Sequence, residues 1–316
     1  MRSLIQFTFI GVFAVLGIAP ATTPLLRQQG RDGNPFTIAV DANLVIFNIT
    51  VTDIKGRRVG GLQASDFQVR EENQLQEIKL FNPEDGPATV GLIIDNSGSM
   101  LEKRAEVTKA TLAFATASNS EDEMFVVTFN EKTSLGLPPS VPFTKDLDQI
   151  QSALVRSPPN GLTALYDALA LGIEHLKGGT RNHKALVVLS DGGDNASSLS
   201  LTSVLQRARQ SSATIYTIGI YDDTSVDRNP RILRKIAESS GGRAYFPESL
   251  QSMEQAWRYI ARDIRSEYTI GYHSSNRNRD GKFRSVKITP NRNAGRDLKI
   301  ETRDGYFVPN DDSIAK

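Results

Sequence analysis

The chain has 316 residues, which is long enough for one large domain and a smaller one. Its 37 lysines and arginines balance 36 aspartates and glutamates, and no basic run with interleaved aromatic residues occurs, so we expect no nucleic-acid partner. Cysteine is absent, which excludes disulfides, thiolate metal sites and cysteine-based redox motifs.

The first 21 residues have the features of an export signal. Arg2 supplies a positive charge, residues 4–19 are mainly apolar, and residues 19–21 (Ala-Pro-Ala) offer a cleavage site. Because this stretch is shorter than the ~20 residues that span a bilayer, we expect a cleaved signal peptide over 1–21, with a retained anchor as the alternative. An exported chain without cysteine is typical of bacteria. We therefore expect the protein in the periplasm, on the cell surface or secreted, without membrane insertion of the mature chain.

Residues 22–35 are polar and contain glycine and proline, which predicts a linker. Beyond it, apolar residues stand at every second position from Val45 to Val51, as in a strand with one buried face. The same period returns near Phe67 and near Ile78. We therefore predict an N-terminal β segment over 36–84.

The pattern changes over 85–265, where apolar runs alternate with amphipathic stretches. The run Val90–Ile94 is typical of a strand buried on both faces of a parallel sheet, and Leu165–Leu176 has apolar residues at helical spacing. Predicted strands lie at 90–94, 124–129, 185–189, 214–220 and 244–246, and predicted helices at 107–114, 165–176, 201–209, 232–237 and 253–264. This alternation predicts a doubly wound, Rossmann-like α/β domain with a mostly parallel sheet.

Alternating residues return over 266–309, for example from Tyr268 to Tyr272, and 310–316 is a polar tail. Neither terminal β segment has enough strands to be stable alone. We therefore expect 36–84 and 266–309 to pair in one discontinuous β-sandwich-like domain, with the α/β domain inserted between them.

Oxygen-bearing side chains stand at three junctions of the predicted α/β domain. They are Asp95, Ser97 and Ser99 after one strand, Thr163 before a helix, and Asp191 after another strand. Ligands of doubly wound sheets bind beyond the carboxyl ends of the strands, so we expect these residues to converge on one ion. Two carboxylates and three hydroxyls, without histidine or cysteine, favour Mg²⁺, with Mn²⁺ or Ca²⁺ as alternatives.

In this order and spacing, the three segments resemble the metal-ion-dependent adhesion site of von Willebrand factor type A (VWA) domains. The resemblance covers 85–265 and implies that Ser97, Ser99 and Thr163 ligate the cation. It also implies that Asp95 and Asp191 act directly or through water, and that an Asp or Glu of a partner protein supplies the last oxygen. The function implied is metal-dependent adhesion or complex assembly and not catalysis.

The flanking segments carry a second resemblance. Residues 51–53, 60–62, 66–69 and 268–272 resemble those of an exported VWA-related family found in acidobacteria.

Two other functions stay open at this point. A metal-assisted hydrolase would need a general base, and His175, His183 and His273 suggest no set convergent with a serine and an aspartate. Alternatively, the ion only stabilises the loops of a structural protein, and the β domain does the binding.

Overall fold

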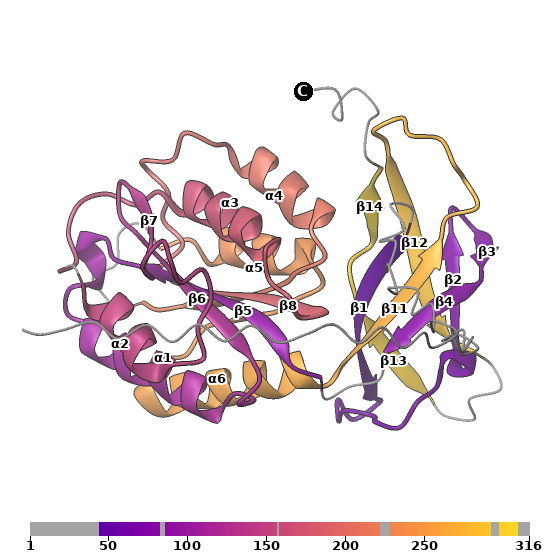
Figure 1. The fold of residues 1–316 in the computed structure, drawn as a ribbon, viewed down its shortest axis with the longest axis horizontal. Coiled ribbons are helices and arrows are strands. Elements are labelled where there is room, and N and C mark those ends of the chain that lie inside the picture. Colours follow the sequence, from indigo (N-terminus) through magenta and orange to yellow (C-terminus); the bar gives the residue numbers. More distant parts are fainter. Residues whose placement is uncertain (1–43, 83–85, 157, 222–227, 292–296, 309–316) are drawn as a thin grey trace, which may run out of the picture. The chain divides into compact units, whose positions relative to one another are not determined.

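The computed structural model describes residues 44–82, 86–156, 158–221, 228–291 and 297–308 (Figure 1). The predicted signal peptide, linker and tail, at 1–21, 22–35 and 310–316, lie outside these residues. No helix of the described ranges is long and apolar enough to cross a membrane.

A six-stranded sheet forms the centre of the α/β part, in the order β10-β9-β8-β5-β6-β7. Its strands are β5 (Ala88–Asp95), β6 (Glu123–Phe129), β7 (Thr133–Leu135), β8 (His183–Ser190), β9 (Thr214–Gly219) and β10 (Ala244–Tyr245). All of them run parallel except β7, which pairs antiparallel with β6 at the edge. Every residue of β5 and β9 is buried, as expected for strands covered on both faces. The predicted mostly parallel sheet is confirmed.

Helices cover both faces of this sheet (Figure 1). They are α1 (Arg104–Ala117), α2 (Leu147–Val155), α3 (Leu165–Leu176), α4 (Leu201–Gln210), α5 (Pro230–Ser239) and α6 (Leu250–Arg265). In Figure 1, α1, α2 and α6 lie on one face and α3, α4 and α5 on the other. Phe114 of α1 packs against Trp257 of α6, with ring centroids 4.6 Å apart, so the outer helices also bury apolar side chains between them.

Helix α2 and strand β7 were not predicted. Asp146 caps α2 by accepting a hydrogen bond from the Asp148 N–H at 2.8 Å, and Ile150 and Leu154 are buried. The sequence therefore carried a helix signal there, an aspartate before an apolar pair at helical spacing. Strand β7 has only three residues, and its last two are exposed, so it leaves no apolar period.

The flanking segments form two four-stranded antiparallel sheets, β13-β1-β11-β4 and β14-β12-β2-β3. Their strands are β1 (Leu44–Asp53), β2 (Phe67–Glu71), β3 (Gln74–Gln76), β4 (Ile78–Asn82), β11 (Glu267–His273), β12 (Phe283–Pro290), β13 (Leu298–Glu301) and β14 (Gly305–Phe307). Phe47 lies opposite Ile270 and Ile49 opposite Tyr268 in the β1–β11 ladder. The two flanks therefore pair, as predicted.

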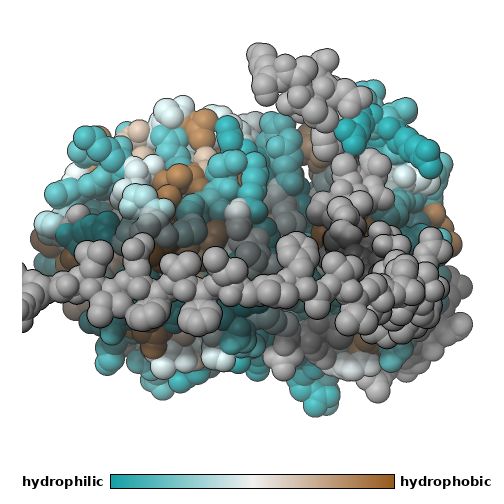
Figure 2. All heavy atoms as spheres, in the orientation of Figure 1, coloured by the Kyte–Doolittle hydropathy of each residue, from teal (hydrophilic) through white to brown (hydrophobic). Residues whose placement is uncertain are grey.

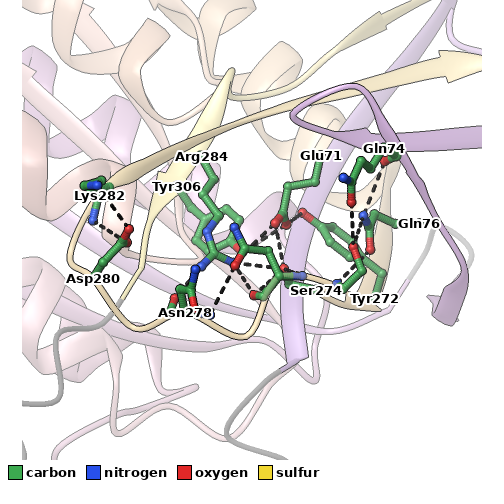
Figure 3. A network of polar contacts seen from close by, with 12 residues as sticks. Glu71, Gln74, Gln76, Tyr272, Ser274, Asn278, Asp280, Lys282, Arg284 and Tyr306 are labelled. Carbon is green, nitrogen blue, oxygen red and sulfur yellow. Dashed lines mark hydrogen bonds and ion pairs between the residues drawn. The ribbon is translucent and has the colours of Figure 1, made fainter.

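A buried polar network joins the two sheets of this sandwich (Figure 3). Glu71 of β2 and Arg284 of β12 form an ion pair at 3.3 Å, with side chains only 2% and 4% exposed. The Tyr272 hydroxyl, from β11 in the other sheet, donates to Glu71 at 2.8 Å, and the Tyr306 hydroxyl donates at 3.0 Å. Ser274 donates to the second carboxylate oxygen at 2.6 Å. The charge of Glu71 is thus fully compensated inside the sandwich.

The sandwich contacts the α/β part near the amino-terminal end of β9. Asn48 donates a side-chain hydrogen bond to the Ser212 carbonyl at 3.2 Å, and Arg303 donates to the Arg209 carbonyl at 2.8 Å. Arg209 lies near the carboxyl end of α4, and Ser212 lies between α4 and β9. Because β9 is parallel to β8 and β5, this contact lies at the edge opposite the carboxyl ends of those strands.

The junction between α6 and β11 holds a buried carboxyl, Glu267. It accepts hydrogen bonds from the Tyr216 hydroxyl at 2.8 Å and the Thr214 hydroxyl at 3.2 Å, while Arg58 pairs with the nearby Asp263. Burial raises the pKa of Glu267 to about 7, and the negative charge of Asp263 adds to this rise.

This raised pKa predicts a specific pH dependence of stability. A carboxyl that holds its proton more tightly when folded stabilises the protein fully below its unfolded pKa of 4.5, and loses this contribution as the pH rises through about 7. The wild type should therefore lose free energy of unfolding relative to Glu267→Gln, on the order of 2 kcal/mol between pH 5 and pH 8. Urea unfolding of both proteins at several pH values measures the difference; parallel pH profiles would show that Glu267 does not titrate in this range.

Candidate metal centre

Two neighbouring strands deliver carboxylates to the same edge of the central sheet. Strands β5 and β8 pair in parallel, with Ile94 opposite Leu189. Asp95 is the last residue of β5, and Asp191 directly follows the last residue of β8. Because both strands end here, their carboxylates come within reach of one another.

Asp95 is held from both sides. Its Oδ1 accepts from the Ser97 N–H at 2.9 Å, and its Oδ2 accepts from the Ser190 hydroxyl at 2.6 Å. Its burial raises the pKa to about 6, against the effect of these hydrogen bonds, and the nearby charge of Asp191 contributes to the rise. Asp95 thus fixes the start of the loop that carries the two serines.

Ser97, Ser99 and Asp191 lie in direct contact. The two serine hydroxyl oxygens are 3.2 Å apart, and the Ser99 hydroxyl donates to Asp191 Oδ2 at 2.7 Å. The other oxygen of Asp191 accepts from the Gly193 N–H at 3.1 Å. In an octahedral shell with metal–oxygen distances of about 2.1 Å, neighbouring ligand oxygens lie roughly 3 Å apart. These side chains therefore fit neighbouring corners of a Mg²⁺ shell.

Thr163 reaches the same edge on the loop before α3. The Gly98 N–H donates to the Gly161 carbonyl at 3.2 Å, which joins this loop to that of the two serines. Gly161 has a φ of 75°, and a Cβ there would lie 2.2 Å from Glu131 Oε2. The same Glu131 oxygen accepts from the Leu162 N–H at 3.3 Å. A glycine at 161 thus leaves room for the Glu131 carboxylate to accept this hydrogen bond.

The five predicted residues accordingly lie at the end of β5 or on loops that meet at one edge of the sheet, where side-chain contacts join Ser97, Ser99 and Asp191 directly. Within the described ranges, no group of three or more histidine, cysteine or acidic side chains is placed to hold a metal. A cation here would depend on the hydroxyls of Ser97, Ser99 and Thr163 as well as on the two carboxylates, so its binding remains a prediction.

The von Willebrand factor type A domain model matches residues 90–257, more than half of the chain. The chain belongs to this family. No curated protein sequence matches it.

Three solved structures of low sequence identity are similar to this chain, and the first of them shares its fold. A von Willebrand factor type A protein from Catenulispora acidiphila is 17% identical, with 81% of this chain and 77% of that chain covered and a TM-score of 0.52. BatB from Bacteroides thetaiotaomicron is 14% identical, over 56% of this chain and 100% of its own, with a TM-score of 0.45. The pilus adhesin SpaC from Lactobacillus rhamnosus GG is 13% identical, over 79% and 49%, with a TM-score of 0.47.

Exposed apolar side chains lie close to the candidate metal site. Leu101, two residues after Ser99, is 60% exposed, and Leu162, directly before Thr163, is 52% exposed. On the face drawn in Figure 2, apolar atoms of the VWA domain form separate patches among hydrophilic ones. Beyond Asp191, Tyr221 stacks on Phe246 with ring centroids 6.0 Å apart. The surface around the candidate site is thus partly apolar.

Three residues outside the predicted ligand set organise the candidate site. Ser190 binds Asp95, Glu131 holds the loop of Leu162, and Asn195 holds Thr163. Ser190 was visible beside Asp191. The other two act across loops that are far apart in the sequence, and only the fold brings them together.

Proposed function

We propose that this VWA domain is an exported protein-binding module whose contact with its partner depends on a divalent cation. Mg²⁺ is the proposed ion, with Mn²⁺ or Ca²⁺ as alternatives. The observation that carries the proposal is the contact of the Ser97, Ser99 and Asp191 oxygens, whose separations of 3.2 Å and 2.7 Å suit one octahedral shell. Thr163 would supply a further hydroxyl, and Asp95 would act through water.

The charge of the donor set points to the chemistry of the partner. Hydroxyls are neutral ligands, and both oxygens of Asp95 already accept hydrogen bonds within the protein. A divalent cation held mainly by hydroxyls keeps much of its positive charge, so it favours an anionic oxygen from outside. An Asp or Glu side chain of a partner protein would supply it.

The position of the sandwich supports this role. It contacts the α/β part near Ser212 and Thr214, at the amino end of β9. The candidate metal site lies at the carboxyl ends of the strands, away from these contacts. Leu101 and Leu162 near it are exposed. A partner could therefore approach the ion without displacing the sandwich.

The positions of the histidines give a metal-assisted hydrolase less support. His183 is the first residue of β8, whereas Asp191 follows its last residue. His175 lies near the carboxyl end of α3, and Thr163 precedes its amino end. His273 ends β11 in the sandwich. A water bound to the ion would have none of these side chains beside it as a general base.

Replacing Thr163 by alanine tests whether this residue contributes more to partner binding than to Mg²⁺ binding. The substitution removes one neutral ligand and leaves both carboxylates in place. We expect Mg²⁺ affinity to fall at least about tenfold, because losing a ligand costs no less than losing a residue that orients it. Capture of the partner protein should fall further, because partner binding also needs an undistorted shell. Calorimetric Mg²⁺ titration and pull-down from an extract of exported proteins measure the two effects. Equal partner capture by Thr163→Ala and wild type at saturating Mg²⁺ would argue against a role for Thr163 in partner binding.

A further inference from the structure

We propose that Asn195 and Asp194, on the loop after β8, are positioning residues that hold Thr163 in place relative to Asp191. The inference rests on the proposed metal site, because it assigns the residues that preorganise one of its ligands. Neither residue belongs to the predicted ligand set.

Asn195 forms hydrogen bonds with both backbone polar groups of Thr163. Its side-chain oxygen accepts from the Thr163 N–H at 2.8 Å, and its own N–H donates to the Thr163 carbonyl at 3.0 Å. The Ala196 N–H donates to the same carbonyl at 3.1 Å. Both backbone polar groups of Thr163 are therefore bound by the loop that begins at Asp191.

Asp194 caps the helix that follows Thr163. The residue at the N-cap position of α3 is Ala164, which has no side-chain acceptor. Instead, the Tyr166 N–H donates to Asp194 Oδ1 and to the Ser197 hydroxyl, both at 3.1 Å. Ser197 in turn donates to Asp194 Oδ1 at 2.6 Å. The amino end of α3 is thus satisfied by side chains from another loop.

These contacts join Thr163 and Asp191 into one unit. The sequence separates them by a helix and a strand, yet residues 194–197 bind the Thr163 backbone and the first turn of α3. Mg²⁺ requires nearly ideal octahedral geometry, and ligands must stay within about 0.5 Å of their positions for tight binding. Holding Thr163 in place before the ion arrives removes an ordering cost from metal binding.

Mg²⁺ binding by the full chain tests this inference. Residues that orient a metal ligand without contacting the metal typically contribute 10- to 100-fold to metal affinity. We therefore expect Asn195→Ala to weaken Mg²⁺ binding about tenfold. Asn195→Asp keeps an oxygen that can accept from the Thr163 N–H and is expected to restore the affinity. Ser200→Ala is the matched control, because Ser200 caps α4 by accepting from the Ser203 N–H and none of its hydrogen bonds reaches Thr163.

A second readout separates positioning from general stability. Exchange of the Thr163 amide hydrogen, followed by NMR without metal, should speed up in Asn195→Ala and stay slow in Ser200→Ala. Wild-type Mg²⁺ affinity and slow exchange in Asn195→Ala would overturn the inference and leave the proposed function standing. A wild type that binds no Mg²⁺ would overturn the proposed function, and this inference with it.

Discussion

Replacing Asp95 by alanine is expected to abolish Mg²⁺ binding while the protein stays folded. Asp95 orders the serine loop through the Ser97 N–H and is tied to Ser190 at the end of β8, so its loss removes a carboxylate and frees the loop. The affinity should fall more than 100-fold, beyond the range for a residue that only orients a ligand. Calorimetric titration with Mg²⁺ measures the loss, and circular dichroism checks the fold.

Asp146→Ala provides the control for this variant. Asp146 also accepts a backbone hydrogen bond, at the start of α2, but it does not belong to the candidate metal site. Its replacement should reduce the free energy of unfolding by about 1 kcal/mol and leave Mg²⁺ affinity unchanged. Retention of wild-type Mg²⁺ affinity by Asp95→Ala would contradict the proposed site.

The second large effect concerns the sandwich. Arg284→Ala removes the only cation paired with Glu71 within the described ranges and leaves a buried carboxylate beside Tyr272 and Tyr306. Loss of one partner of a buried ion pair typically costs 3–5 kcal/mol. We therefore expect the free energy of unfolding to fall by about 3–5 kcal/mol, measured by urea denaturation.

A double variant separates charge from packing. Glu71→Gln with Arg284→Met removes both charges and keeps similar side-chain volumes, so it should lose less than Arg284→Ala alone. A loss in the double variant equal to or larger than that in Arg284→Ala would show that the stability of the sandwich does not depend on compensating the Glu71 charge.

The order of elements in the α/β domain could be predicted because its strands are buried on both faces. Residues 90–94 form a continuous apolar run, and all of β5 is buried. The pairing of the flanks followed from a similar argument, since alternating residues such as Phe47 and Ile49 needed an apolar partner surface, which β11 supplies. Strands β7 and β14 have only three residues each, too few to leave a period in the sequence.

The candidate site was only partly accessible from the sequence. Oxygen donors at the ends of strands predict convergence, because the carboxyl ends of parallel strands share an edge. The hydrogen bonds of Asn195 with Thr163 and of Glu131 with Leu162 could not be predicted, because loop conformation decides both contacts. The buried Glu71–Arg284 pair was missed for a related reason: charged residues in an alternating segment are normally placed on the solvent face.

Partner capture with and without the cation tests the central claim most directly. Immobilised wild-type protein is incubated with an extract of exported proteins in Mg²⁺, in EDTA, and in EDTA followed by excess Mg²⁺. The account predicts a partner that binds in Mg²⁺, is lost in EDTA and returns when Mg²⁺ is restored. Unchanged capture in EDTA would contradict it and assign the binding to the β-sandwich.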